Sequence, residues 1–205
     1  MMTDRPPFSW EQVTEEQEAT RLLSFARSLT LAPRSCLWHA GDSPDLLVRV
    51  AQGLLRAKVV LADGREYIKE FYWEGDEFLD FHHLLSGEPA RYSVEALEPC
   101  RLQIFQLTDL RQLPCWPGWY QHLLAVQLRI KEEKELLLLT GSPQARYQHF
   151  LQCFPGLAAR VPDHQIAAYL GITPISLSRI RKRLKENLTK VNASADPPDY
   201  AGRPN

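Results

Sequence analysis

The sequence predicts an α+β protein: a small N-terminal β-barrel, then a long helix, then two short helices near the C-terminus. Residues 35–108 contain short alternating runs of apolar and polar side chains between glycines, which is typical of strands and turns. Residues 116–139 carry apolar residues at helical spacing. Residues 160–190 hold seven Lys or Arg against Asp163 and Glu186, whereas the 205-residue chain has a net charge of −1. The chain therefore joins an acidic body to a basic C-terminal segment.

The N-terminal part is predicted to begin with a helix and to continue as a barrel. A helix is expected over residues 11–30, ended by Pro33, with an apolar side made of Leu22, Leu23, Phe25, Ala26 and Leu29. Residues 46–73 alternate β-branched and aromatic side chains around Asp63-Gly64, a pair that favours a hairpin because glycine tolerates positive φ. Several short strands with regular turns indicate a small barrel or sandwich.

The long helix over residues 116–139 has two apolar stripes. One stripe, with seven-residue spacing, resembles a coiled-coil seam, and a second stripe consists of Leu124, Leu128 and Leu138. We expect the first stripe to be a dimer seam, and the alternative is that it packs on the chain's own barrel. The residues expected in the dimer seam are Trp119, Leu123, Val126, Ile130 and Leu137, preceded by Trp116.

Two further helices are predicted from their capping residues. Ser142 followed by Pro143 is a suitable start for a helix that runs to about Phe154. Residues 162–186 then predict a helix-turn-helix, in which Gly171 supplies the turn. Thr173 caps the second helix and Pro174 takes its first position. The shared core of the two helices is expected to contain Ile166, Ala167, Leu170, Ile172, Leu177, Ile180 and Leu184.

The second helix of this pair presents a basic outer face. Arg179, Lys182 and Arg183 lie together there because residues three and four apart are neighbours on a helix. Such a face suits double-stranded DNA, since residues near the helix start reach base edges and flanking cations meet phosphates. The alternative is an ordinary helical hairpin with a solvated basic face. The residues expected at DNA are Thr173, Ile175, Ser176, Ser178, Arg179, Lys182 and Arg183.

The order of these elements resembles the Crp/Fnr superfamily of transcription regulators over roughly residues 20–188. Its most specific part is RVPDHQIAAYLGITPISLSRIRKRL, and Gly53, Asp63-Gly64 and residues 71–79 match the barrel more loosely. The resemblance implies a jelly-roll, cyclic-nucleotide-binding-like sensor domain with its N-terminal helix and a homodimer. The implied division is 1–115 for the sensor, 116–140 for the dimerisation helix, 141–190 for the helix-turn-helix domain and 191–205 for a disordered tail.

The resemblance also indicates where an effector would bind, and there the chain departs from the family pattern. Nucleotide-binding members carry Gly-Glu and then Arg-Ser-Ala, whereas this chain has Leu79-Asp80 and Ala90-Arg91-Tyr92. A one-residue shift of the arginine on a strand turns its side chain to the opposite face. Asp80 and Arg91 are therefore the candidate effector residues of a degenerate pocket, and cyclic nucleotide binding is not expected. Arg91 could instead pair with Glu88 or Glu95.

Other classes of function lack support in the sequence. The four cysteines are scattered, and adjacent histidines at 82–83 have no further ligands nearby, so no metal or iron–sulfur site is expected. No G-x-S-x-G, P-loop, H-E-x-x-H or dinucleotide motif is present, so we expect neither catalysis nor a cofactor. No apolar run could span a membrane, which favours a cytoplasmic protein. The expected partners are DNA, a second copy of the chain and RNA polymerase; the alternative is a ligand-binding adaptor without DNA binding.

Overall fold

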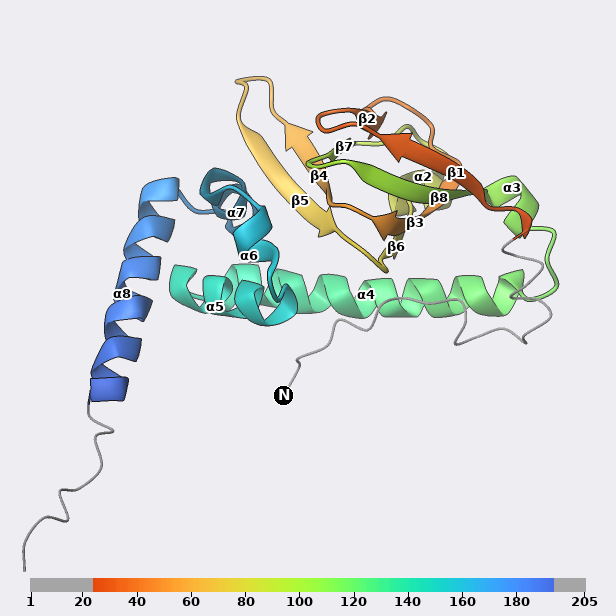
Figure 1. Cartoon of the computed structure of the whole chain (residues 1–205). Coiled ribbons are helices and arrows are strands. Elements are labelled where there is room, and N and C mark those ends of the chain that lie inside the picture. Colours follow the sequence, from red (N-terminus) through yellow and green to blue (C-terminus); the bar gives the residue numbers. More distant parts are fainter. Residues whose placement is uncertain (1–23, 194–205) are drawn as a thin grey trace, which may run out of the picture. The chain divides into compact units, whose positions relative to one another are not determined.

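The computed structural model describes the backbone of residues 24–193 and the side chains up to Asn187 (Figure 1). The chain divides into two compact units, Met1–Thr140 and Gly141–Asn205. Within residues 24–193, the first unit contains two antiparallel sheets and a long helix, and the second contains only helices. The α+β fold class predicted from the sequence is confirmed. No helix within residues 24–193 is long and apolar enough to cross a bilayer.

The first unit folds as a jelly roll of two four-stranded sheets. One sheet has the order β1-β8-β3-β6 and the other β2-β7-β4-β5. Their non-consecutive neighbours bring together segments far apart in the sequence, such as β3 beside β8. The strands are β1 (Arg27–Leu31), β2 (Cys36–Trp38), β3 (Leu46–Gln52), β4 (Leu55–Val60), β5 (Glu66–Tyr72), β6 (Glu77–Phe78), β7 (Ser93–Ala96) and β8 (Cys100–Gln106).

The predicted N-terminal helix is wrong over its last residues. Residues Arg27–Leu31 form strand β1, which pairs antiparallel with β8 from Arg27 opposite Ile104 to Leu31 opposite Cys100. The apolar spacing that suggested a helix is overridden because β1 satisfies its backbone groups on the edge of a sheet. The rest of the predicted helix, from residue 11 to 23, lies outside the described residues, as does the tail from 194.

The hairpin and one tight turn position the sheets. Strands β4 and β5 form the predicted hairpin around Asp63-Gly64, closed by a hydrogen bond from the Leu61 amide to the Arg65 carbonyl (2.9 Å). Between β3 and β4, Gly53 has φ 103°, and a Cβ there would lie 2.6 Å from both Cys100 Sγ and the Pro99 carbonyl oxygen. Only glycine fits this turn, because both the dihedral and the space exclude a side chain.

Helix α4 (Trp116–Thr140) follows a short helix, α3 (Leu107–Leu110), and packs along the jelly roll (Figure 1). Trp119 and Leu123 are buried there in a cluster with Leu47, Leu79 and Phe105. These two residues of the expected dimer seam therefore belong to the chain's own core, which was the alternative interpretation of that stripe. Val126 and Ile130 lie on the same face and line a cleft described below. Leu137, one helical repeat further, is half-buried.

Of the predicted second stripe, Leu128 is exposed on the opposite face of α4, Leu138 is 38% exposed and Leu124 is half-buried; Leu136 and Leu139 are also exposed. Leu128 is 63% exposed and Leu139 is 76% exposed, with Leu136 similarly open. Leu128 and Leu139 lie eleven positions apart, close to three helical turns, and so share one face. The heptad pattern therefore located the helix but not its partner, because both stripes carry leucines at helical spacing.

The described part of the second unit, up to residue 193, contains four helices: α5 (Pro143–Cys153), α6 (Leu157–Arg160), α7 (Asp163–Leu170) and α8 (Pro174–Ala193). The predicted cap of α5 is confirmed, since the Ser142 hydroxyl accepts a hydrogen bond from the Ala145 amide at 3.2 Å. The core contains an aromatic cluster of Tyr147, Phe150, Phe154 and Tyr169. Helix α7 packs on this core and on α8.

Candidate functional site

The helix-turn-helix of the second unit is positioned by a small apolar core. Ile166, Ala167 and Leu170 of α7 are buried, as are Leu177 and Ile180 of α8. Ala167 is fully buried, and its lack of bulk lets α8 come close to α7. Because α8 crosses α7 at this contact, the chain must turn tightly where α7 ends.

Gly171 and Thr173 make the turn. Gly171 ends α7 in the left-handed region at φ 65° and ψ 35°, and its amide bonds the Ala167 carbonyl. The Thr173 hydroxyl accepts a hydrogen bond from the Ser176 amide at 3.1 Å and lies 2.9 Å from the Ser176 hydroxyl. The predicted cap is therefore present. It holds the first turn of α8 and leaves Ser176 half-buried, with its hydroxyl already engaged.

The outer face of α8 is exposed and basic. Ser178, Arg179, Lys182 and Arg183 are all exposed, and the neighbouring Ile175 is 66% exposed. Among these cations, Lys182 has a distant contact of 4.0 Å with the exposed Glu186. An ion pair this open to solvent contributes little. The face therefore presents positive charges to solvent, next to the apolar side chain of Ile175 in the first turn of the helix.

Arg181 is a basic residue of α8 that points inward instead. It bonds Asp163 at 2.6 Å and the Tyr147 hydroxyl at 2.9 Å, which links α8 to both α7 and α5. The sequence reasoning did not single it out. Its spacing was informative, since it lies four residues after Leu177 and three before Leu184, on the inner side of the helix. Arg181 is thus a structural cation within the basic segment.

The predicted effector cassette lies between β6 and β7 and contains helix α2 (Phe81–Ser86). Asp80 is only 1% exposed, and its Oδ1 accepts hydrogen bonds from the amides of His82 (2.9 Å) and His83 (3.1 Å). It therefore caps α2. Its Oδ2 is buried and has no hydrogen-bond partner among the described residues. Leu79 before it is buried in the core between the sheets and α4.

Arg91, the other candidate effector residue, does not join Asp80. Its side chain is 71% exposed and pairs with Glu88 at 3.0 Å. The hydrogen bond from Arg91, followed by that from His82, lowers the pKa of Glu88. Of the two pairings considered from the sequence, the one with Glu88 is present. Tyr92, the next residue, is the one that points inward and is buried. Its burial, together with the charges of Asp80 and Glu70, raises its pKa.

A half-buried lysine, Lys69, lies beside Tyr92. The Nζ atom of Lys69 lies 4.3 Å from the centroid of the Tyr92 ring, a favourable cation–π distance. Burial, and then the charge of Lys131, lowers the pKa of Lys69 to about 8. The sequence reasoning missed this residue because a lysine in an alternating strand is ordinarily on the solvent side.

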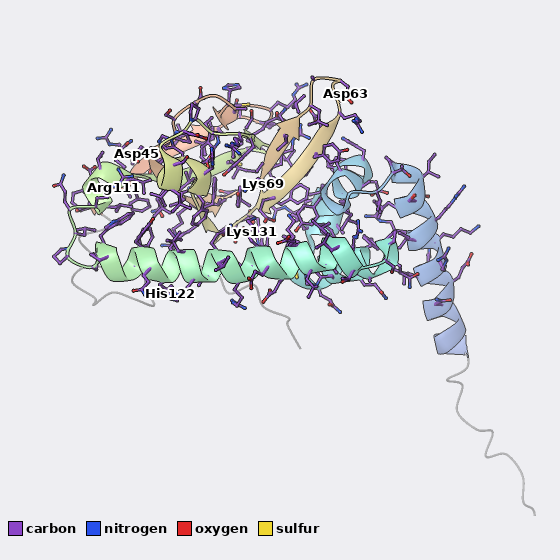
Figure 2. All side chains as sticks on the ribbon, turned by 180° about the vertical axis from the view of Figure 1, so that it is seen from behind. Asp45, Asp63, Lys69, Arg111, His122 and Lys131 are labelled. Carbon is purple, nitrogen blue, oxygen red and sulfur yellow. The ribbon has the colours of Figure 1, made fainter. Side chains whose placement is uncertain are left out.

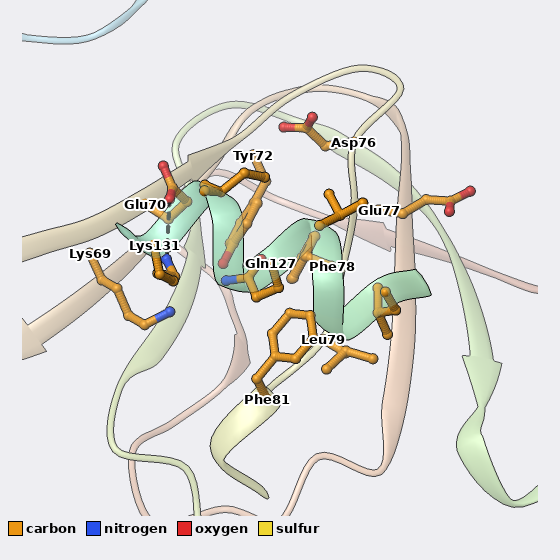
Figure 3. Close-up of a pocket in the computed structure, with 13 residues that line it drawn as sticks. Lys69, Glu70, Tyr72, Asp76, Glu77, Phe78, Leu79, Phe81, Gln127 and Lys131 are labelled. Atoms are coloured by element: carbon orange, nitrogen blue, oxygen red, sulfur yellow. Dashed lines mark ion pairs between the residues drawn. The ribbon is translucent and has the colours of Figure 1, made fainter. Parts of the chain in front are cut away.

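Lys69 opens onto a cleft between strands β5–β6 and helix α4. The cleft has an empty volume of about 550 Å³, open solvent at its mouth included. Figure 3 shows Lys69, Glu70 and Lys131 on one side of it and Phe78, Leu79 and Phe81 on another. Its other lining residues are Tyr72, Asp76, Glu77, Leu123, Val126, Gln127 and Ile130.

Two lysines of α4 hold strand β5 at this cleft. Glu70 Oε2 lies 3.7 Å from Lys131 Nζ and 3.8 Å from Lys134 Nζ. Lys134 also donates a hydrogen bond to the Lys69 carbonyl at 2.6 Å. The side-chain view in Figure 2 places Lys131 on the side of α4 that faces β5. A ligand in the cleft would therefore touch both the sheet and the long helix.

The cysteines and histidines do not assemble into a site. Cys36, Cys100, Cys115 and Cys153 form no disulfide bond with one another. His82 pairs with Glu88 at 3.0 Å, and His83 Nδ1 lies 2.9 Å from the Glu88 carbonyl oxygen. Across the described residues, no three His, Cys, Asp or Glu side chains are grouped to hold a metal ion.

Comparison with known proteins places this geometry in a family. Residues 28–114 match the cyclic nucleotide-binding domain family. FixK2 from Bradyrhizobium japonicum has a similar structure, with a TM-score of 0.67 and 25% identity over 79% of this chain and 85% of that one. A CooA mutant from Carboxydothermus hydrogenoformans also gives a TM-score of 0.67, at 16% identity over 90% of this chain and 87% of that one.

A further similar structure is the c-di-GMP-responsive regulator CLP from Xanthomonas campestris, with a TM-score of 0.62 and 18% identity. It covers 84% of this chain and 93% of that one. For CooA and CLP, the similarity is one of fold. No curated protein sequence matches the chain.

The fold consists of a domain of the cyclic nucleotide-binding type followed by a helix-turn-helix unit. In this order of domains the chain is similar to transcription regulators of the Crp/Fnr type such as FixK2.

Proposed function

We propose that this protein binds specific double-stranded DNA through the outer face of α8 and acts as a homodimer. The observation that carries the proposal is the set of exposed residues at the start and flank of α8, on a helix fixed by the α7 core and the Thr173 cap. Ile175 and Arg179 would meet bases, and Lys182 and Arg183 would meet phosphates. Thr173, Ser176 and Ser178 complete the expected contact surface.

The homodimer would form through the exposed leucines of α4. Leu128, Leu136 and Leu139 leave apolar area open on a long helix whose other face is already packed. A second copy of the same helix offers the matching stripe, as two-fold dimers bury the same patch from both subunits. Two α8 helices in one dimer would then read two half-sites of a DNA operator. A regulator that activates would also contact RNA polymerase.

The sensor domain would not use cyclic nucleotides. The space that a cyclic phosphate would need is taken by Tyr92 and the Lys69 amine beside it. Arg91 pairs with Glu88 at the surface instead. Leu79 replaces the glycine that would let phosphate approach the backbone. We therefore expect no cofactor of this class.

Selection of bound sequences from a random duplex library, followed by mobility-shift titration, tests DNA binding. The expected result is enrichment of one motif with two-fold symmetry and tight binding to it. The alternative function, a ligand-binding adaptor of the same fold, predicts no enriched motif and no shift at low salt. The exposed cations of α8 favour the regulator over the adaptor.

A further inference from the structure

One end of the cleft between β5–β6 and α4 carries more positive than negative groups. Three amines gather there, from Lys69, Lys131 and Lys134, and Glu70 is shared by the two amines of α4. Asp80 is the second carboxylate whose charge acts on Lys69, but its Oδ1 caps α2. Three ammonium groups therefore face two carboxylates among the described residues.

Of these three amines, that of Lys69 forms no ion pair with Glu70. Within the described part of the chain, its Nζ has no hydrogen bond or ion pair, and its one polar contact is the face of the Tyr92 ring. Burial and the charges of Lys131 and Lys134 lower its pKa, while Glu70 and Asp80 act in the opposite direction. Burial and the neighbouring lysines thus disfavour the charged form of Lys69. A nearby anion would stabilise this form, because an opposite charge favours the ionised state.

The rest of the cleft carries an apolar wall, and the carboxylates of Asp76 and Glu77 also line it. Phe78, Phe81 and Ile130 line it, and Gln127 of α4 adds an amide that can donate or accept. An inorganic anion would use only the amine end and leave these side chains uncovered. Pockets of this kind favour a ligand with an apolar body and one charged group that fixes its orientation.

We propose that the cleft binds a small organic carboxylate, with its carboxylate group between Lys69 and Lys131 and its apolar body against Phe78, Phe81 and Ile130. The ligand joins a residue of β5 to a residue of α4, which Lys131 already approaches through Glu70 (Figure 3). Binding of the carboxylate is independent of the proposed function. Its consequence for DNA, a change in affinity when α4 is fixed on the sheet, rests on that function.

Titration of the full chain by NMR, observing backbone amides, tests the proposal. Sodium benzoate and sodium hexanoate are the probes, benzamide is the neutral analogue of the same shape, and sodium phosphate is an anion without an apolar body. At least one carboxylate is expected to saturate with shifts in β5, β6 and α4. Benzamide and phosphate should bind at least about tenfold more weakly, as a hydrogen bond to a charged group and apolar burial each contribute a kilocalorie or more. No saturation with either carboxylate, or equal binding of benzamide, overturns the proposal.

Variants and pH separate the charge effect from general binding. Lys69→Met and Lys131→Met should each weaken the bound carboxylate by about tenfold or more. Arg101→Met removes an exposed cation of the same domain outside the cleft and should leave binding unchanged. Lys131 is half-exposed, so its variant remains informative if Lys69→Met fails to fold. Unchanged affinity in Lys131→Met overturns the assignment.

The protonation of Lys69 gives a second readout. Affinity for the carboxylate should fall between about pH 6.5 and about pH 9.5, because the amine loses its charge as pH rises through its lowered pKa. Lys69→Met should lose most of this pH dependence, and an unchanged pH profile in that variant counts against the proposal. Mobility shifts on the selected duplex without carboxylate, in the same samples, report DNA binding separately. A protein that binds DNA but no carboxylate refutes this inference alone.

Discussion

The cations of α8 have different tasks although they are neighbours in the sequence. Arg181 points inward and joins three helices through Asp163 and Tyr147, whereas Arg179 and Arg183 point outward. Composition alone would count all three as one basic cluster. The inward and outward positions follow from the 3.6-residue repeat, which fixes each side chain's direction once the buried Leu177 and Ile180 are known.

Arg179 and Arg183 should respond differently to truncation. Arg179→Ala is expected to cost roughly 1–3 kcal/mol on the specific duplex and to relax the preference at one base pair, because a base-reading arginine grips guanine with two hydrogen bonds. Arg183→Ala should weaken specific and non-specific duplexes alike and reduce the salt slope by about one unit. Binding curves on matched and scrambled duplexes at several salt concentrations are the measurement. Equal losses on both duplexes for Arg179→Ala would show that it does not read bases.

Two glycines of the first unit should respond in opposite ways to alanine. Gly53→Ala is expected to destabilise the chain by about 2 kcal/mol or more, since φ is 103° and the new Cβ would meet backbone at 2.6 Å. Gly118 lies in α4 with open space around it. Gly118→Ala should therefore stabilise the chain by up to roughly 0.5–1 kcal/mol through helix propensity. Urea unfolding of both variants checks the pair, and a similar effect in each would contradict this account of Gly53.

At the scale of elements, local signals in the sequence were sufficient to predict α5, α7 and α8 of the second unit, whereas the short helix α6 was not predicted. Ser142, Gly171 and Thr173 each act on residues within four positions, so their roles in capping and turning could be predicted and are confirmed. Strand β1 was missed because its partner, β8, lies about seventy residues away. Pairing over such a distance leaves no periodic signal in the strand itself.

Tertiary contacts also explain why the cleft was not foreseen. Lys69 and Lys131 are 62 positions apart, and the pairing of β5 with α4 that brings them together depends on the whole first unit. The two leucine stripes of α4 illustrate the same limit, because helical spacing identifies a face but not what covers it. Asp80 was found from the sequence, yet its observed contacts are those of a helix cap.

The cassette between β6 and β7 should not respond to cyclic nucleotides. Titration calorimetry with cyclic AMP and cyclic GMP is expected to show no nanomolar binding, as Arg91 faces solvent and Tyr92 fills the interior. Thermal unfolding in the same solutions gives an independent measure, since a ligand at a hundred times its Kd would add about 2.7 kcal/mol of stability. Tight saturable binding, or a clear rise in Tm, would mean that the interior can open around a nucleotide.

In the whole molecule, each of the two compact units contains one of the two proposed binding sites. The unit ending at Thr140 holds the cleft, and the unit beginning at Gly141 holds the helix-turn-helix. Helix α4 belongs to the first unit and ends at the boundary between the two. Helix α4 thus connects the unit with the cleft to the unit with the helix-turn-helix along the chain, and its exposed leucines are where a second copy would bind in the proposed homodimer.

Leu128→Glu is expected to dissociate the homodimer without unfolding the sensor domain. Leu128 is 63% exposed in the single chain, so a charge there disturbs only a surface that another molecule would cover. Leu85→Glu is the matched control, because Leu85 is 61% exposed and belongs to α2 and not to α4. Sedimentation at micromolar concentration should report a dimer for the wild type and for Leu85→Glu, and a monomer for Leu128→Glu.

The same pair of variants should separate in DNA binding. A monomer loses the second half-site contact, so Leu128→Glu should bind the selected two-fold duplex on the order of a hundredfold more weakly. Its affinity for a single half-site should match that of the wild type, because α8 lies in the other unit and is unchanged. A wild-type chain that is monomeric, or a Leu128→Glu variant that remains dimeric, would contradict the α4 interface. If Leu128→Glu remains dimeric while Ile130→Asp dissociates, the seam lies on the barrel-facing side, and α4 must leave its own sheet to form it.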